Sequence, residues 1–236
     1  MTIFIGTAGW SVPAIHGRHF SKPGSHLVRY SARLKAAEIN SSFWRPHQQK
    51  TYARWAASVP ADFRFSVKLP RAITHEGRLA NYREHLPRFL EEIAGLGSKL
   101  AVILVQLPPS LTLDRSVARK FFRHLAGKTD AAIACEPRHA SWFTPPADNF
   151  LRDLAVVRVA ADPARVPAAA QPGGDARFRY WRLHGSPRPY ISNYDRKSLK
   201  ALAAQLRPGD WCIFDNTMSS AALGNAVDLK KLTEKA

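Results

Sequence analysis

The chain has 236 residues, of which 45% are hydrophobic and 22% charged, so it can form one large domain or two small ones around a sizeable core. Its longest apolar run, residues 100–105, is far too short to span a bilayer, and we expect no signal peptide because residues 1–6 lack a basic leader and a long apolar segment. Two cysteines, Cys135 and Cys212, exclude a disulfide framework and favour a reducing, cytoplasmic setting.

Charge is the most unusual feature of the composition. The 35 lysines and arginines outnumber the 18 aspartates and glutamates, which gives a formal net charge of +17. Residues 1–90 alone carry 14 basic and 4 acidic side chains. Such a balance favours anionic partners, either nucleic acid or phosphorylated molecules. The alternative is compositional, because a GC-rich genome also produces arginine beside many alanines and prolines through codon bias.

The N-terminal third of the chain alternates between predicted strands and helices. Residues 2–6 form a β-branched and aromatic run that predicts a strand, and a glycine-containing turn follows at 6–10. This turn is a weak phosphate signature, because no helix follows it directly. Apolar residues at helical spacing predict a helix after Ser25, which can serve as its N-cap. Residues 37–40 then predict the second strand.

The middle of the chain continues the same alternation. A helix containing Tyr52 and Trp55 is expected to stop at Pro60, and residues 63–69 predict the third strand. The next helix is expected to begin near Pro87 and to end at 95–97. Residues 100–107 are almost wholly apolar, which is typical of a parallel strand buried on both faces.

The C-terminal half supplies four more strands and one interruption. Asp114 can cap a helix, and residues 131–136 and 156–162 predict strands on either side of a short helix near Phe150. Residues 163–177 contain three prolines and two glycines, so we expect a loop where the sixth helix should be. Two further strands, at 178–184 and 211–215, are each followed by a helix; Asp195 can cap the first, and the second begins near Ser219.

Eight strands alternating with about seven helices predict a single (β/α)8 barrel, or TIM barrel, that comprises residues 1–236. No linker or repeat divides the chain. A doubly wound open sheet is the second choice, because the regular alternation up to the last helix favours closure.

Polar side chains gather at the carboxyl end of every predicted strand, whereas the opposite ends carry few. In this barrel type the active site lies at the carboxyl ends. The polar groups there are Thr7, Trp10, Glu38, Asn40, Lys68, Gln106, Glu136, Arg138, Asp162, Arg182, His184, Asp215 and Asn216. We therefore predict that the functional site is a ring formed by these strand ends.

The alternation of strand side chains indicates which of these groups share a face. Residues two apart point the same way, so Arg138 is expected to lie one layer above Glu136, and His184 one layer above Arg182. Cys135 then points outward and is expected to be a core thiol. Charges inside one mouth must compensate one another, because an unpaired buried charge is costly. A network that only satisfies itself is the alternative to a functional site.

The residue types in this ring suit acid–base chemistry on an anion. Glu136 or Asp215 can act as a general base, and His184 or His139 as an acid or base near neutral pH. Arginine and lysine can hold phosphate or carboxylate groups; the candidates are Lys68, Arg138 and Arg182. Aromatic residues can offer stacking faces at the rim; the candidates are Trp10, Trp44, Trp142 and Tyr190. The catalytic candidates are Glu136, His184 and Asp215.

No spacing in the chain matches a metal signature, so we predict no metal site. A P-loop, a dinucleotide fingerprint and a nucleophile elbow are also absent from the sequence. The sequence indicates no cofactor and leaves the oligomeric state open.

Seven segments at the predicted strand ends resemble, in chain order, those of the DUF72 (YecE-like) family. They are IGTAGW at 5–10, EINSSF at 38–43, ITH at 73–75, QLPPS at 106–110, EPRHASW at 136–142, HG at 184–185 and FDNT at 214–217. The resemblance implies a TIM barrel in a bacterial or archaeal cytoplasmic protein. It adds His75, His139 and Trp142 to the candidate ligand-binding residues and brings no established reaction.

Two positions depart from the pattern of the family. Trp44 stands where the family commonly has tyrosine, and residues 16–20 replace an aromatic-proline segment in the first loop. For the family, nucleic-acid binding or processing is suggested by the likeness of its pocket to those of DNA-repair barrels.

Three functions are compatible with the sequence. The leading hypothesis is a barrel that binds a phosphorylated ligand, with DNA and RNA among the candidates, and processes it by hydrolase-like chemistry. The second is an enzyme that acts on a small anionic metabolite or sugar, and the third is a non-catalytic binding module. No membrane partner is expected.

Overall fold

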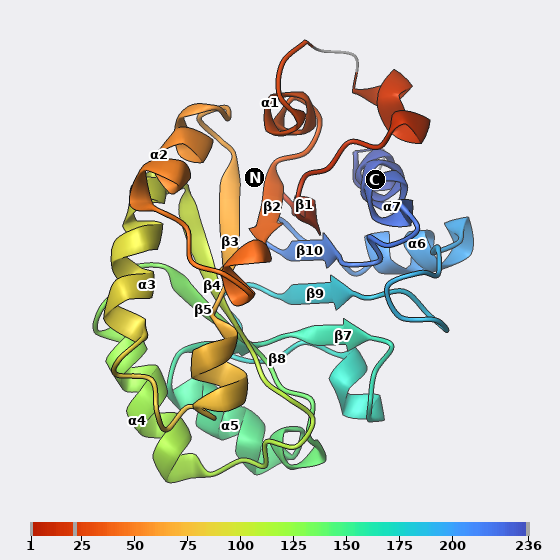
Figure 1. Ribbon diagram of the computed structural model, residues 1–236. Coiled ribbons are helices and arrows are strands. Elements are labelled where there is room, and N and C mark those ends of the chain that lie inside the picture. The colour runs from red at the N-terminus through yellow and green to blue at the C-terminus, as the bar shows by residue number, and fades with distance from the viewer. Residues whose placement is uncertain (1, 21–22, 235–236) are drawn as a thin grey trace.

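The structure is a computed structural model that describes residues 2–20 and 23–234, and parallel strands form its centre (Figure 1). From β1 to β6 and from β9 to β10, each strand pairs with the next along the chain, and β1 also pairs with the last strand, β10. The parallel strands are β1 (Phe4–Ala8), β2 (Ala36–Ile39), β3 (Arg64–Lys68), β4 (Leu100–Gln106), β5 (Ala132–Glu136), β6 (Val156–Arg158), β7 (Ala160–Asp162), β9 (Tyr180–Leu183) and β10 (Trp211–Phe214).

The barrel closes through residues 156–162. β6 pairs with β5, whereas β7 pairs with β9, and only Val159 separates the two short strands. The N–H of Val159 donates to the carbonyl oxygen of Cys135 at 2.8 Å, so the break does not detach this segment from β5. Residues 156–162 thus serve as one strand of the wall, and the predicted (β/α)8 barrel is confirmed. The doubly wound open sheet is excluded.

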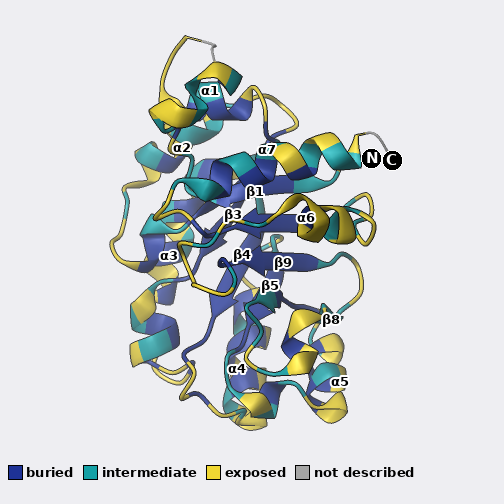
Figure 2. Cartoon of the chain, turned by 90° about the vertical axis from the view of Figure 1, so that its right-hand side faces the viewer, coloured by how far each residue is buried: buried dark blue, intermediate teal, exposed yellow. Residues whose placement is uncertain are grey.

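Helices cover the outside of the barrel, as Figures 1 and 2 show. The three predicted N-caps are present: the side chains of Ser25, Asp114 and Asp195 each accept a hydrogen bond from a backbone N–H of the first turn. The helices are α1 (His26–Ser31), α2 (Gln49–Ala57), α3 (Leu86–Ile93), α4 (Arg115–Ala126), α5 (Pro145–Asp153), α6 (Arg196–Ala203) and α7 (Ala221–Thr233).

The loop predicted in place of the sixth helix is confirmed. It contains a 3-10 turn at Pro167–Ala170 and the two-residue strand β8 (Gly173–Gly174), which pairs antiparallel with β6.

Three predicted starts were displaced by two residues. The first strand begins at Phe4 and not at Thr2, because its ladder with β10 begins at the pairing of Phe4 with Trp211. The strand predicted from residue 178 begins at Tyr180, which is the first residue of its ladder with β10. The last helix begins at Ala221 and not at Ser219, because Ser220 has a left-handed backbone with φ of +63°.

Apolar side chains form two layers, one inside the barrel and one between the strands and the helices. Leu104, Ala134 and Ile213 belong to the inner layer. Cys135 and Cys212 are fully buried in the outer layer, as the strand alternation predicted. Burial raises the pKa of both thiols. Within the described ranges, no helix combines the length and the apolar composition needed to cross a membrane.

Candidate functional site

Polar side chains replace the apolar inner layer at the carboxyl ends of the strands. The inner residues Ala36, Leu104 and Ile213 are each followed, two positions later, by a polar residue that the same alternation turns inward. We call the resulting group the mouth ring. It consists of Glu38, Lys68, Gln106, Glu136, Arg138, Arg182, His184 and Asp215.

Arg182 lies at the centre of the ring and is fully buried. Its Nε and Nη2 donate to the two carboxylate oxygens of Glu38, at 2.9 and 2.6 Å. Its Nη1 donates to Glu136 Oε2 at 2.6 Å, and Nη2 also reaches Asp215 Oδ2 at 3.1 Å. One guanidinium therefore bridges three carboxylates from three strands, and none of its nitrogens is left free for a ligand.

Glu136 is the carboxylate with the most partners. Oε2 accepts from Arg182 and from Gln106 Nε2 at 3.1 Å, and Oε1 accepts from Arg138 Nη2 at 3.1 Å and from His184 Nε2 at 2.9 Å. Burial alone would raise the pKa of Glu136, but the positive charges of Arg182, His184 and Arg138 hold it well below its usual range. Glu136 is thus an ionised anchor at neutral pH.

His184 bridges two carboxylates. Nδ1 lies 3.1 Å from Asp215 Oδ2, and Nε2 lies 2.9 Å from Glu136 Oε1. A carboxylate can only accept, so both ring nitrogens must carry hydrogens, and His184 is an imidazolium. Burial opposes this charge, but the adjacent Glu136 and Asp215 raise the pKa of His184. The guanidinium nitrogens of Arg138 and Arg182 lie farther from Nε2, at 3.4 and 3.5 Å, and donate to the carboxylates instead.

Asp215 has one oxygen that the ring does not use. Oδ2 accepts from Arg182 and His184, whereas Oδ1 accepts no hydrogen bond from the residues that the structure describes. The positive charge of Arg182 and the hydrogen bond from His184 outweigh burial and lower the pKa of Asp215. This ionised oxygen is the acceptor of the ring that is free for a ligand.

Lys68 differs from the other cations of the ring. Its Nζ lies 3.9 Å from the centre of the Phe43 ring and makes no hydrogen bond or ion pair with any described residue. The side chain is nearly buried, with 6% of the residue exposed. Burial and the charge of Arg182 lower the pKa of Lys68 to about 8, although Glu38, Glu136 and Asp215 act in the opposite direction.

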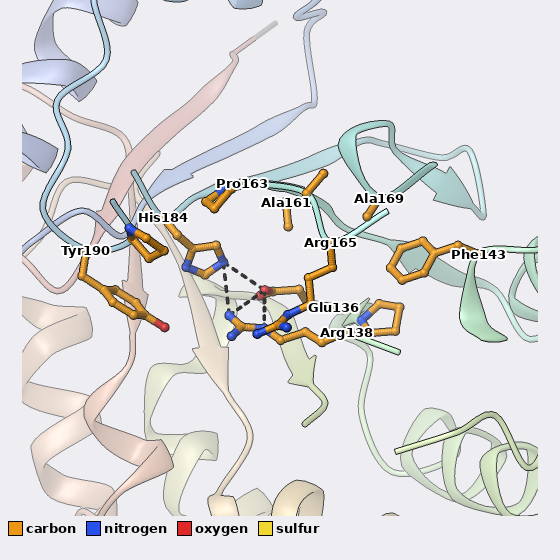
Figure 3. A pocket seen from close by; sticks show the side chains of 12 residues that line it. Glu136, Arg138, Phe143, Ala161, Pro163, Arg165, Ala169, His184 and Tyr190 are labelled. Atoms are coloured by element: carbon orange, nitrogen blue, oxygen red, sulfur yellow. Dashed lines mark hydrogen bonds and ion pairs between the residues drawn. The ribbon is translucent and has the colours of Figure 1, made fainter. Parts of the chain in front are cut away.

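A cavity of about 160 Å³ opens beside Glu136 and His184 (Figure 3). Arg138 lines it and is partly exposed, with 21% of its side chain accessible to solvent. Tyr190 packs edge-on against His184, with 5.8 Å between ring centres, and Arg165 and Phe143 lie on the opposite side of the cavity. The cavity therefore joins the acid–base groups of the ring to two arginines.

The structure does not bring two of the predicted residues on β1 and its following turn to the ring. The Thr7 N–H donates to the Tyr30 hydroxyl of α1 at 2.8 Å, and Trp10 packs edge-on against Trp55 and Phe65 in the outer layer. Thr7 faces the helices because Ile5, two residues earlier, already belongs to the outer layer. Trp10 lies beyond the end of β1, where the strand alternation no longer applies.

Asp162 and Asn216 also face outward. Asp162 accepts a hydrogen bond from the Tyr194 hydroxyl at 2.6 Å, because the inward positions of its strand belong to Val157 and Val159. The side-chain amide of Asn216 donates to the carbonyl oxygen of Ser192, at 2.8 Å, and to Asn225 of α7 at 2.9 Å. The sequence placed Asp162 among the balancing charges of the mouth, whereas its place is under the helices.

The remaining predicted residues lie around the ring. His75 packs against Phe43, and its pKa falls to about 4 through burial and the nearby charges of Lys68, Arg71 and Arg138. The Asn40 side-chain oxygen is buried without a described partner. His139 caps the turn at Ala140–Trp142.

Trp142, expected to offer a stacking face at the rim, is instead buried in the outer layer, where its indole N–H donates to the carbonyl oxygen of Leu111 at 2.9 Å.

Sequence reasoning missed two kinds of site residue. Tyr180 lies one layer below Arg182, and its hydroxyl is 3.0 Å from Ser66 Oγ and 3.3 Å from Glu38 Oε2. The two-residue spacing from Arg182 could have indicated it. Arg165 and Phe143 come from loops, and no periodic signal in the sequence indicates where a loop side chain points.

The chain is similar to several proteins of one family. Residues 4–236 match the family described as "Protein of unknown function DUF72". The protein YunF of Bacillus subtilis is 29% identical over 61% of this chain and 53% of its own length, and YecE of Escherichia coli K12 is 24% identical over 74% and 64%. The chain thus matches about half to two thirds of the length of these relatives. A DUF72 family protein of Thermotoga maritima, solved by crystallography, is 24% identical over 99% of this chain and all of its own, with a TM-score of 0.80.

Proposed function

This chain belongs to the DUF72 family of proteins of unknown function, and we propose that it binds a compact phosphorylated ligand at the carboxyl ends of its barrel strands. The charge of the mouth ring carries this proposal. Three carboxylates face four cationic groups, so the ring holds one excess positive charge while His184 is protonated. The carboxylates are Glu38, Glu136 and Asp215, and the cationic groups are Lys68, Arg138, Arg182 and His184. A bound anion restores neutrality.

Two of the cations are available to that anion. Arg182 is saturated by three carboxylates, whereas Arg138 uses Nε and Nη2 on Glu136 and leaves Nη1 bonded to no carboxylate. The Lys68 ammonium has no described hydrogen-bond partner. A phosphate group has several acceptor oxygens and can accept hydrogen bonds from both guanidinium and ammonium groups. Phosphate held between Arg138 and Lys68 satisfies donors that the ring itself leaves open.

The same ring supplies acid–base groups. His184, an imidazolium that donates both of its N–H groups to carboxylates, fixes the orientation of Asp215, and the free oxygen of Asp215 is the acceptor that can orient a water or a hydroxyl group. Glu136, whose two oxygens are both occupied, positions His184 and Arg138. Hydrolysis of a phosphate ester is the reaction that this arrangement suits.

The size of the cavity favours a small ligand. A cavity of about 160 Å³ holds a phosphate ester of a few carbons and is below the range of roughly 300–1,000 Å³ usual for drug-sized ligands. Melting the protein with inorganic phosphate, glycerol 3-phosphate or glycerol tests the proposal. The two phosphates should raise the Tm in a saturable manner, and glycerol at the same concentrations should not. Equal shifts from all three, or none, would contradict the proposal.

Nucleic acid is the second candidate ligand, and the rim favours it. Trp44 is 69% exposed, and the Arg71 guanidinium lies 5.8 Å from its ring, which is a suitable platform for stacking a base. The net charge of +17 acts in the same direction. Specific phosphate contacts with duplex DNA should make log K fall with log salt by about 0.9 per contact. Failure to bind DNA and RNA even at low salt would remove this candidate and leave the compact ligand.

Turnover separates an enzyme from a binding module. Wild-type protein should release inorganic phosphate from glycerol 3-phosphate, and Asp215→Asn should lower kcat by about 100-fold or more, because a positioned base contributes about that much. If the wild-type rate does not exceed that of Asp215→Asn while phosphate still raises the Tm, the ring binds without catalysis.

A further inference from the structure

Lys68 is the one charged residue of the mouth ring for which the described residues provide no oppositely charged partner. Every other charged side chain of the ring hydrogen-bonds to an opposite charge, whereas the Lys68 amine makes no described hydrogen bond or ion pair. Among the described residues, the amine lies against the face of Phe43, 3.9 Å from the ring centre. A buried ammonium that serves only the fold normally has carboxylate or carbonyl partners. Lys68 therefore calls for a functional explanation.

The position of Lys68 makes the amine reachable. It is the last residue of β3, at the carboxyl end of the barrel, and 6% of the residue remains exposed. Ser66, two residues before Lys68, hydrogen-bonds to the Tyr180 hydroxyl inside the barrel, so the Lys68 side chain faces the same interior one layer nearer the mouth. A ligand whose anionic group contacts Arg138 can thus present a second group to the Lys68 amine.

We propose that Lys68 is an amine nucleophile that forms an imine with the carbonyl group of a phosphorylated aldehyde or ketone bound in the mouth ring. This inference names the ligand class for the site and rests on the proposed binding of a phosphorylated ligand. Geometry supports it through the unpartnered, nearly buried Lys68 amine at the inward-facing end of β3. Arg138 lines the cavity beside Glu136 and His184 and has a nitrogen bonded to no carboxylate.

The protonation of Lys68 is consistent with this role. Burial lowers the pKa of its amine to about 8, so roughly a quarter of the molecules carry a neutral Lys68 at about pH 7.5. For an ordinary lysine the neutral fraction at this pH is about one in a thousand. Lys68 should therefore react on the order of 100-fold faster than a solvated lysine of equal intrinsic nucleophilicity.

The covalent step is balanced without a redox partner. The lone pair of Nζ adds to the carbonyl carbon, the π electrons of the C=O bond move to oxygen, and a proton passes from nitrogen to that oxygen. The resulting carbinolamine takes a second proton on its hydroxyl group, loses water and forms the C=N bond. Solvent water at the mouth supplies that second proton, because both N–H groups of His184 already donate to Glu136 and Asp215. One water molecule is the sole by-product.

Reductive trapping tests the inference with two matched aldehydes. The protein is incubated with glycolaldehyde phosphate or with glycolaldehyde, in the presence of cyanoborohydride, which reduces imines and leaves aldehydes intact. Peptide mapping by mass spectrometry then gives the rate of modification at each lysine. Lys50 and Lys120, both exposed, are internal controls in the same molecule. Lys68→Arg keeps the positive charge and cannot form an imine, and Lys68→Met removes the charge at similar size.

We expect Lys68 to be modified by both aldehydes on the order of 100-fold faster than Lys50 and Lys120. Glycolaldehyde phosphate should react at lower concentration than glycolaldehyde, and inorganic phosphate should compete with it. Modification of Lys68 no faster than that of the control lysines overturns the inference, whatever happens to phosphate binding. Fast modification by both aldehydes, with no preference for the phosphorylated one and no competition, supports the nucleophile and contradicts the phosphate site.

Discussion

At Arg182, a single guanidinium compensates carboxylates from β2, β5 and the end of β10. Its role differs from that of Arg138, which lines the cavity and has a nitrogen bonded to no carboxylate. Two arginines in one site thus have separate tasks: Arg182 holds the ring together and Arg138 faces the ligand. The sequence showed both as strand-end arginines, and only their partners distinguish them.

Replacing Arg182 by methionine should lower the free energy of unfolding by about 3–5 kcal/mol, because it leaves three buried carboxylates without their shared cation. Urea unfolding measures this loss. The matched control is Arg88→Met, which breaks the ion pair with Glu92 on the surface of α3 and should cost less than about 1 kcal/mol. Similar losses in the two variants would contradict the account of the ring.

His184 makes stability depend on pH in a defined direction. Its pKa is raised on folding, so its contribution is fully present below the unfolded value of about 6.5 and is lost as pH rises through the folded pKa. The pKa values of Glu136 and Asp215 are lowered, so their contributions are lost only as pH falls through those lowered values. Between neutral and mildly alkaline pH, the change within this trio therefore comes from His184.

The difference in unfolding free energy between wild type and His184→Gln isolates this contribution. It should be largest near about pH 6 and should shrink towards alkaline pH, as the pH rises through the raised folded pKa and His184 loses its proton in the wild type. Urea unfolding at a series of pH values gives the difference. A difference that stays constant over this range would mean that His184 is not an imidazolium in the folded protein.

At the scale of the elements, the spacing of the barrel wall depends on close backbone contacts. β1 lies so near β2 that a Cβ added at Gly6 would be 2.1 Å from the carbonyl oxygen of Ala36 and 3.1 Å from the Tyr30 hydroxyl. That hydroxyl donates to the same carbonyl oxygen at 2.8 Å and accepts from the Thr7 N–H. A single tyrosine of α1 thus joins both strands at the end of the barrel that carries the site.

Gly6→Ala should lower the free energy of unfolding by at least about 2 kcal/mol, because the backbone of β2 cannot yield without moving the wall. Gly17→Ala is the control: no atom lies within 4 Å of its added Cβ, and it should change stability by about 0.5 kcal/mol or less. Denaturant unfolding of the two variants measures the contrast. If Gly6→Ala is as stable as Gly17→Ala, the close contact between β1 and β2 is not required.

The site can be predicted from the sequence only for strands in which the residue types distinguish the inward face from the outward face. In β5 and β9 the charges at Glu136 and Arg182 mark the inward face, and the partners two residues on follow it. In residues 156–161 valine and alanine occupy both faces, and the one charged residue, Arg158, pairs with Asp148 of α5 on the outer side. The sequence alone does not show which side Arg158 takes, so it did not mark Asp162, four residues on, as outward. Trp142 follows a strand by several residues, where the two-residue period no longer applies.

At the scale of the whole molecule, the count of eight strands with intervening helices was sufficient to predict closure. The break at Val159 did not affect that count, because β6 and β7 together replace one strand. The contacts that make the ring a site could not be predicted in the same way. They join residues up to 144 positions apart, as Arg182 and Glu38 are, and only the closed barrel brings these together.

The net charge of +17 is a property of the entire chain, whereas the excess in the mouth ring is a single charge. We assign ligand binding to the excess charge of the mouth ring and not to the net charge of the chain. A variant that removes one surface arginine should therefore leave phosphate binding unchanged, although it lowers the net charge as much as a variant in the ring does. Arg123 is suitable, because it is exposed near the C-terminal end of α4, away from the mouth.

The most direct test is calorimetric titration of inorganic phosphate into wild-type protein, Arg138→Met and Arg123→Met at low ionic strength. The account predicts saturable binding to the wild type, an unchanged Kd for Arg123→Met, and a Kd raised by about 10-fold or more for Arg138→Met, since a hydrogen bond to a charged group contributes about 1.5–3 kcal/mol. Equal weakening in both variants, or no saturable binding to the wild type, would contradict the claim that the mouth ring is an anion site.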